Sequence, residues 1–369
     1  MPERALDPAQ GLGKVGYRPV NAGPGQAAAA LPSLAIGSAW CSIDGVSSSG
    51  RELIMLSLFR RKSALGLFVL LPACGLTAGF CSPRPIDEAA LAAFYAEPLP
   101  PAEGPLQVYH LGHSLVGRDM PVMLAQLAGD GHVFHSQLGW GAFLRQHWEP
   151  DVPVNGFAKA NFHPQHRDPR EALATGEYDA LVLTEAVEIR DSIRWFAPAD
   201  YLHRFAELAW ENNPDTRVYL YETWHRTDGE EDWFMRVDRD LGLYWEGEIL
   251  RRAIAYDDAR RPIYVIPGGQ VMAAVAREAE ARGGVGPLQD RDDLFSDNIH
   301  FSDYGAYLMA LTHYAVLYRR SPVGLPHALT KLDGSPAADP GPEAARMMQE
   351  VVWQVVTSYA PTGVSAEAG

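Results

Sequence analysis

Short apolar runs alternate along the chain with longer stretches in which apolar residues recur every three or four positions. The short runs cover residues 107–111, 133–137, 180–184, 218–222 and 263–266. The longer stretches cover residues 121–128, 201–212, 241–259, 271–282, 304–318 and 342–359. Short apolar runs are typical of buried strands, and the longer period is typical of helices. Strands that alternate with helices of this length indicate β–α–β units and a parallel sheet.

The pattern predicts an α/β protein with a three-layer α/β/α sandwich. About five mainly parallel strands with helices on both faces would make it flavodoxin-like. Asp200 and Ser302 precede the helical stretches at 201–212 and 304–318, and we expect both residues to be N-caps. Ligands of such sheets bind beyond the carboxyl ends of the strands. The residues just after each strand are therefore the first places to look for chemistry.

The first 81 residues differ in composition from the rest. Residues 1–54 are rich in Gly, Ala, Pro and Ser, which indicates a disordered arm or an extension upstream of a true start at Met55. Residues 55–81 hold three basic residues, an apolar run and then small residues, the layout of a secretory signal. Cys74 follows a sequence that resembles a lipoprotein cleavage box, with ordinary cleavage near Ala78 as the alternative. We expect an exported protein, periplasmic or secreted, whose membrane contact would be a lipid at Cys74. Without such a signal it would be cytoplasmic.

The remaining chain divides into three parts. Residues 82–105 are rich in Pro and Ala, with one short helical patch, and are predicted to be a linker or an N-terminal strap. Residues 106–325 are predicted to form the catalytic domain. Residues 326–369 are a C-terminal extension whose helix could pack on the domain or form a dimer contact.

Charge and cysteine content exclude several classes of protein. The 46 acidic residues outnumber the 31 basic ones, and a net charge of −15 disfavours a nucleic-acid partner. All three cysteines lie within the first 81 residues, so the predicted domain has no thiol nucleophile or zinc–thiolate site. Neither a glycine-rich nucleotide loop nor the His-Glu-x-x-His zinc motif occurs. We expect no cofactor and no metal.

Two polar motifs stand where chemistry is expected. Ser114 follows the first predicted strand, at a turn where its hydroxyl and its N–H would face the carboxyl edge of the sheet. Such a serine can be a nucleophile or a simple helix cap. Asp297 and His300 precede the last long helix but one, at a spacing that lets the carboxylate orient the imidazole as a base. The alternative is a capped turn.

Together the two motifs resemble the SGNH/GDSL superfamily of serine esterases and lipases. The likeness lies in Gly112-His113-Ser114-Leu115, where His113 replaces the usual aspartate, and in Asp297-x-x-His300. It extends over about residues 106–321. The resemblance implies a catalytic triad of Ser114, His300 and Asp297.

The resemblance also implies an oxyanion hole with three donors. The first two are the N–H of Ser114 and the N–H of a glycine, for which Gly141 fits best and Gly139 is the alternate. The third is an asparagine side chain, but this chain has Thr184 and Glu185 at that place. An ionised carboxylate cannot donate. Either Thr184 donates, Glu185 is protonated, or two backbone donors suffice.

Aromatic and polar residues after the strands suggest the substrate. Trp140, Trp224 and His225 follow predicted strands, and together with Glu185 they are expected to contact substrate. Aromatic rings suit the apolar faces of sugars. The resemblance implies a serine esterase, and with the predicted export and these aromatic residues we expect it to hydrolyse short acyl esters, above all acetyl esters of a carbohydrate. The alternatives are an exported glycan-binding protein without catalysis and an O-acyltransferase that uses the same triad.

Overall fold

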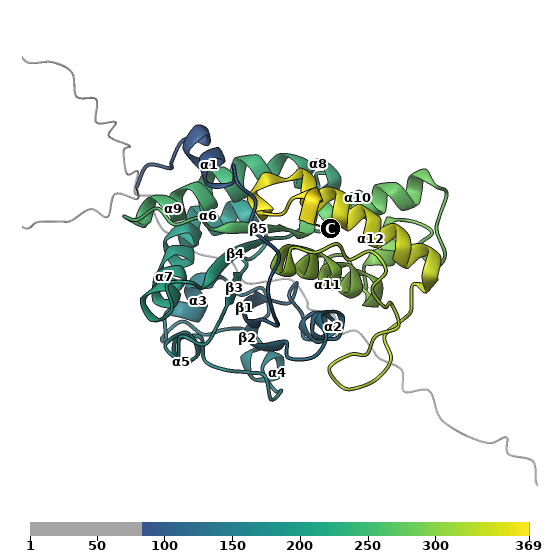
Figure 1. The fold of residues 1–369 in the computed structure, drawn as a ribbon, viewed down its shortest axis with the longest axis horizontal. Helices are drawn as coiled ribbons and strands as arrows, with labels where there is room; N and C mark the ends of the chain where they lie inside the picture. Colours follow the sequence, from purple (N-terminus) through teal and green to yellow (C-terminus); the bar gives the residue numbers. More distant parts are fainter. Residues whose placement is uncertain (1–82, 369) are drawn as a thin grey trace, which may run out of the picture. The chain divides into compact units, whose positions relative to one another are not determined.

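The computed structural model describes residues 83–368. The predictions for residues 1–54 and for the signal at 55–81, with Cys74, lie outside the described residues. Five strands form one sheet: β1 (Gln107–His113), β2 (Val133–Gly139), β3 (Ala180–Leu183), β4 (Arg217–Glu222) and β5 (Tyr264–Pro267). All pairs are parallel, and the order across the sheet is β2-β1-β3-β4-β5. Figure 1 shows the strands at the centre of the fold.

Helices cover both faces of the sheet. One layer contains α2 (Asp119–Ala128), α10 (Gly268–Ala281), α11 (Asp303–Tyr318) and α12 (Gly341–Ser358). The other contains α3 (Leu144–Trp148), α5 (Pro169–Leu173), α7 (Pro198–Asn212) and α9 (Arg251–Tyr256). The two groups lie on opposite sides of the strands in Figure 1. The predicted three-layer α/β/α sandwich is confirmed.

The other elements are short or irregular. They are α1 (Glu88–Phe94), α4 (Phe157–Ala160), α6 (Ile189–Phe196), α8 (Trp233–Asp240), the π-helical η1 (Leu241–Leu250), and the 3₁₀ turns η2 (Arg291–Leu294), η3 (Ala360–Thr362) and η4 (Ala366–Ala368). The helix predicted over 241–259 thus belongs to a continuous helical stretch that begins at Trp233. None of the described helices is long and apolar enough to span a membrane.

The two predicted helix caps have different outcomes. Ser302 caps α11 as predicted, since its hydroxyl accepts a hydrogen bond from the N–H of Gly305 at 3.4 Å. The Asp200 prediction is wrong: α7 begins earlier, at Pro198, because proline suits the first turn of a helix. Asp200 lies inside that turn, where its carboxylate accepts a hydrogen bond from Arg204 at 2.9 Å.

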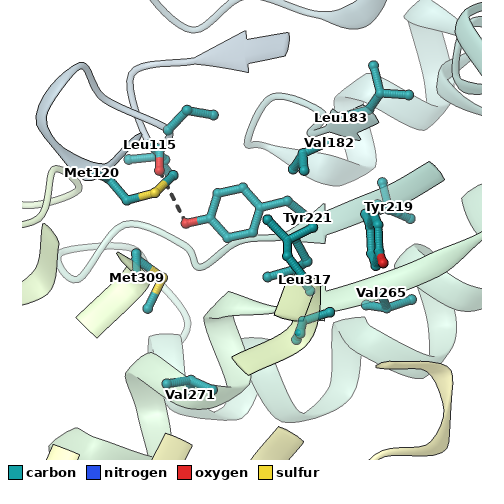
Figure 2. Close-up of a cluster of buried hydrophobic side chains, with 14 of the residues drawn as sticks. Leu115, Met120, Val182, Leu183, Tyr219, Tyr221, Val265, Val271, Met309 and Leu317 are labelled. Atoms are coloured by element: carbon teal, nitrogen blue, oxygen red, sulfur yellow. Dashed lines mark hydrogen bonds between the residues drawn. The ribbon is translucent and has the colours of Figure 1, made fainter. Parts of the chain in front are cut away.

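The core connects directly to the turn that carries Ser114. Figure 2 shows the Tyr221 ring of β4 among apolar side chains that include Met120 and Met309. Within this cluster the Tyr221 hydroxyl donates a hydrogen bond to the carbonyl oxygen of Leu115 at 3.2 Å. The ring is fully buried, so it ties the residue after Ser114 to the middle of the sheet.

Residues before β1 lie against the sandwich as a strap. The Tyr95 hydroxyl donates to the carbonyl oxygen of Ile263 at 2.5 Å, just before β5. The N–H of Ala102 donates to the carbonyl oxygen of Tyr318 at the end of α11, at 3.1 Å. At the other end of the chain, α12 buries one face against α10 and α11. Of the two arrangements considered for the C-terminal helix, the structure has the one that packs on the domain.

Candidate active site

Ser114 directly follows β1, next to the point where the sheet order reverses. β1 lies between β2 and β3, so the loops after these three strands meet at one edge. The Ser114 Oγ lies 2.9 Å from Nε2 of His300, although the two residues are 186 positions apart in the chain. The fold therefore brings together the two motifs that the sequence singled out.

Asp297 completes a hydrogen-bonded chain with these two residues. Its Oδ2 lies 2.7 Å from His300 Nδ1, and its Oδ1 accepts the N–H groups of Ile299 and His300 at 2.9 and 2.8 Å. Desolvation opposes ionisation of Asp297, but the His300 N–H, the His300 ring and the Ile299 N–H outweigh it and lower the pKa to about 2. Asp297 is therefore ionised at neutral pH. It orients the imidazole with Nδ1–H toward itself and leaves Nε2 as the acceptor that faces Ser114.

Two buried histidines form hydrogen bonds that hold the turn that carries Ser114. His113 Nε2 lies 2.9 Å from the carbonyl oxygen of Glu185, and its Nδ1 accepts the N–H of Leu115 at 3.2 Å. His147 Nε2 lies 2.9 Å from the carbonyl oxygen of Gly112. Burial lowers the pKa of each ring to about 4. Both rings are therefore neutral at pH 7, and because a carbonyl oxygen can only accept, each carries its hydrogen on Nε2.

The loop that carries His300 fits closely against the serine turn. Gly117 has φ +64°, and a Cβ at this position would lie 2.8 Å from the ring of Phe301. The indole N–H of Trp224 donates to the carbonyl oxygen of Ile299 at 2.7 Å. These contacts fix the residues on both sides of His300. The position of His300 therefore depends on its neighbours in the loop as well as on Asp297.

The expected oxyanion donors are placed as follows. Among the described residues, neither the Ser114 N–H nor the Gly141 N–H donates to a protein oxygen. Both residues line the same cleft as His300. Gly141 has φ +56° and open space around it, whereas Gly139 ends β2 with Val154 and Ala142 packed where a Cβ would be. Of the two candidate glycines, Gly141 is therefore the one that lines the cleft.

The two side chains considered as third donors are not in the cleft. The Thr184 hydroxyl is buried and donates to the carbonyl oxygen of Tyr221 at 2.7 Å, so it is not available to an oxyanion. The Glu185 carboxyl is also buried, where it accepts the N–H groups of Ala186 at 2.8 Å and Leu144 at 3.4 Å. Desolvation raises the pKa of Glu185 to about 8. The carboxyl is thus protonated at neutral pH, but it lies in the core and does not contact the cleft, which corrects its expected substrate-binding role.

A cleft of about 690 Å³ opens at Ser114 and His300. Trp140, 52% exposed, and His225 both line it, as the sequence led us to expect. Trp224 does not line it: the ring is completely buried and packs at a tilt on Phe301. The expected substrate platform at Trp224 is therefore corrected to a support beneath the His300 loop.

Sequence reasoning missed the polar wall of this cleft. Three arginines and three carboxylates form a closed series of ion pairs, the arginine–carboxylate ring: Glu188, Arg190, Glu231, Arg239, Asp240 and Arg236. Four of them, Glu188, Arg190, Glu231 and Arg236, line the cleft. The available signal was the four-residue spacing of Arg236 and Asp240 on α8, which is typical of a helical ion pair.

The described residues contain no group of three or more His, Cys, Asp or Glu side chains arranged to hold a metal ion. The polar groups that line the cleft include the Ser114 hydroxyl, the imidazoles of His300 and His225, and ion pairs of the ring.

No family model and no curated protein matches the chain. Solved structures with some likeness include a DUF4886 family protein from Bacteroides uniformis, at 15% identity and a TM-score of 0.43, covering 68% of this chain and 94% of that one. A protein described as a GDSL-like lipase from Parabacteroides merdae has 15% identity and a TM-score of 0.36, covering 58% and 96%. The acetyl xylan esterase AlAXEase has 15% identity and a TM-score of 0.36, covering 57% and 100%.

Proposed function

We propose that the protein is a serine esterase of the SGNH/GDSL type that hydrolyses short acyl esters. Acetyl esters of a carbohydrate are its proposed substrates. The observation that carries the proposal is the hydrogen-bonded chain Asp297–His300–Ser114 at the edge of an open cleft. A hydroxyl, a base and a carboxylate in this order are the arrangement of an activated serine nucleophile.

The proposed reaction has two steps. His300 Nε2 takes the proton of Ser114 as the hydroxyl oxygen attacks the ester carbonyl, and Asp297 stabilises the imidazolium that forms. In this reaction the N–H groups of Ser114 and Gly141 stabilise the oxyanion. His300 then protonates the leaving alcohol, and water releases the acyl group from Ser114 by the same route. With only two donors, we expect a turnover about 100- to 1,000-fold below that of a site with a third donor.

The composition of the cleft supports a short acyl group. Its apolar lining is confined to Leu115, Trp140, Val187 and Ile299, and most of the other lining side chains are charged or polar. A long acyl chain in this space would remove water from these charged and polar groups, which is costly. An acetyl group needs little apolar surface. Trp140 offers an exposed aromatic face at the rim, which suits a sugar ring.

The proposal is tested by labelling with a fluorophosphonate, which reacts covalently with activated serines. We expect one adduct per chain on the wild type and none on Ser114→Ala, measured by intact mass. Turnover of 4-nitrophenyl acetate is expected to fall on the order of 10⁴- to 10⁶-fold in the same variant. Ser335→Ala is the matched control, because the Ser335 hydroxyl bonds to Asp333 and does not line the cleft, and this variant should label normally. A folded wild type that forms no adduct would favour a glycan-binding protein without catalysis.

We also propose that the protein is exported, on the pattern of residues 55–81 alone. The N-terminal sequence of the protein recovered from its native cells tests this. A start after about residue 74 or 78 supports cleavage, and an intact residue 55 opposes it.

A further inference from the structure

His225 is a second histidine of the cleft, and the proposed mechanism does not use it. It lies in the loop after β4, and it lines the same cleft as Ser114 and His300. Its side chain is only 5% exposed, and Nε2 lies 3.1 Å from Oδ2 of Asp240. The cleft therefore holds two histidine–carboxylate pairs, of which only the pair of His300 and Asp297 contacts the serine.

The His225 ring has unused hydrogen-bonding capacity. Its Nε2 is buried, and within residues 83–368 it makes no hydrogen bond of good geometry, so the contact with Asp240 is electrostatic and bent. Buried polar side chains nearly always have a hydrogen-bond partner. Because Nε2 faces Asp240, a ligand in the cleft would bond to the other ring nitrogen, Nδ1.

The arginine–carboxylate ring holds Asp240 in place behind His225. Asp240 Oδ2 accepts Arg236 Nε at 2.8 Å, and its Oδ1 accepts Arg239 Nε at 2.8 Å. Burial opposes ionisation of Asp240, but His225, Arg236 and Arg239 outweigh it and lower the pKa to about 2. An ionised carboxylate can only accept, so it favours a hydrogen on the Nε2 that faces it. Nδ1 of His225 is then the nitrogen left to accept a hydrogen bond from a ligand.

The arginine–carboxylate ring adds no net charge to the cleft wall, because its three arginines balance its three carboxylates. Arg236 forms a two-pronged pair with Glu188, at 2.6 and 2.8 Å, and Arg190 contacts Glu188 and Glu231 at 3.0 and 2.9 Å. Each arginine is thus already matched by carboxylates. An anionic substrate would have to displace a carboxylate from its arginine, and an apolar one would cover charged groups without compensation. A neutral molecule with several hydroxyl groups can bond to such a wall without breaking it.

We propose that His225 is a substrate-positioning residue whose Nδ1 accepts a hydrogen bond from a hydroxyl on the alcohol part of the ester. The arginine–carboxylate ring makes the cleft selective for esters of neutral polyols over esters of acidic sugars. This inference rests on the proposed esterase function for its kinetic readout. Its binding readout does not depend on that function.

The kinetic test compares two variants, His225→Phe and His225→Asn, on two esters. One ester is 4-nitrophenyl acetate, whose leaving group has no hydroxyl, and the other is a mono-acetylated methyl glucoside. We expect His225→Phe to lose roughly 10- to 100-fold in kcat/KM on the sugar ester, mainly through KM, and to lose at least about fivefold less on the aryl ester, which lacks the hydroxyl. Asparagine places a polar atom near the position of Nδ1, so His225→Asn is expected to recover part of the loss. The rate of fluorophosphonate labelling should be the same in all three proteins.

The selectivity test uses the wild type alone. We expect kcat/KM on the acetylated methyl glucoside to exceed that on the corresponding acetylated methyl glucuronide by at least about tenfold. Equal rates on the two sugars would overturn the selectivity for neutral polyols. Equal losses of His225→Phe on the sugar and aryl esters, or no loss on the sugar ester, would overturn the positioning role.

A binding measurement separates this inference from the esterase proposal. If the wild type forms no adduct with the fluorophosphonate, the esterase proposal fails, and the affinity for methyl glucoside still tests His225. Weaker binding by His225→Phe than by the wild type, in NMR titrations of proteins with equal melting temperatures, supports the contact. Equal binding overturns it.

Discussion

The two histidine–carboxylate pairs of the cleft contain the same groups in opposite surroundings. The side chains of His300 and Asp297 are 44% and 51% exposed, whereas those of His225 and Asp240 are 5% and 1% exposed. Both carboxyl groups have a pKa lowered to about 2, but the causes differ. Each carboxylate is stabilised by its imidazole, but backbone N–H groups add to this at Asp297, whereas Arg236 and Arg239 add to it at Asp240.

We expect this difference to decide which pair carries a proton in the proposed reaction. Backbone donors have no net charge, so the negative charge of Asp297 remains to stabilise an imidazolium at His300. The charge of Asp240 is neutralised by Arg236 and Arg239, so little of it is left to stabilise an imidazolium at His225. A histidine therefore needs more than an adjacent carboxylate to act as a base. The charge of that carboxylate must also not be neutralised by neighbouring cations. The following predictions test this comparison.

The largest contrast is expected between Asp297→Asn and Asp240→Asn. Asparagine at 297 no longer stabilises the imidazolium and holds the wrong tautomer, so kcat on 4-nitrophenyl acetate should fall on the order of 10⁴-fold. The same change at 240 should lower it less than about tenfold in the protein that remains folded. Steady-state kinetics at pH 7 measure both. Similar losses in the two variants would contradict the division of roles.

The same two variants should rank in the opposite order in stability, with the larger loss in Asp240→Asn. Asp240→Asn leaves Arg236, which is 7% exposed, short of a partner, and should reduce the free energy of unfolding by about 3–5 kcal/mol. Asp297→Asn removes an exposed pair, for which about 1 kcal/mol or less is expected. Urea unfolding followed by tryptophan fluorescence measures both values. A smaller loss at 240 than at 297 would mean that the ring contributes little to folding.

Glu185 extends the comparison to a buried carboxyl without a cation beside it. Desolvation raises its pKa from 4.5 to about 8, so between these pH values the unfolded chain binds fewer protons than the native one. Stability should then fall as pH rises through this window, by up to a few kcal/mol in total at about 1.4 kcal/mol per pH unit. In Glu185→Gln this contribution should disappear. Part of the slope should persist, because desolvation also raises the pKa of Glu222 to about 8. Thermal unfolding from pH 5 to 8 measures the two slopes, and identical slopes would oppose the assignment.

The smallest effect is expected at Trp224, beneath the exposed pair. Trp224→Phe keeps the buried ring but removes the hydrogen bond to Ile299, which should cost about 1 kcal/mol of stability. The His300 loop then has one contact fewer, and we expect a few-fold loss of kcat without a change in KM. A loss confined to KM on sugar esters would instead return Trp224 to the substrate platform that the sequence suggested.

The sequence predicted the strands, the helices and the two motifs that meet at the cleft from local signals. The strand at 180–183 is buried on both faces, so its residues form a continuous apolar run that can be recognised without a structure. Ser114 and the Asp297–His300 motif are likewise short patterns next to strand and helix ends. Each of these features is defined by residues that are neighbours along the chain.

The parts that could not be predicted depend on contacts between distant segments. The arginine–carboxylate ring joins the start of α6, the loop before α8 and α8 itself, so its members lie up to 52 positions apart. Glu185 and Trp224 stand at the expected strand ends, but the direction in which each side chain points follows from the packing of α3 and of the His300 loop. Position at the sheet edge therefore predicts that a residue is near the site, and packing decides whether it faces the cleft.

The strap before β1 has a consequence for how the two ends of the described chain resist fraying and proteolysis. The N–H of Leu99 donates to the carbonyl oxygen of Gly363 at 2.9 Å, so the N-terminal and C-terminal segments are bonded to each other as well as to the sandwich. If either end detached, this hydrogen bond would break and the other end would be exposed to water. A fragment cut at Leu106, where composition placed the domain boundary, would lose this closure and uncover the apolar surface beneath Tyr95, whereas a cut before Pro83 would leave both ends protected.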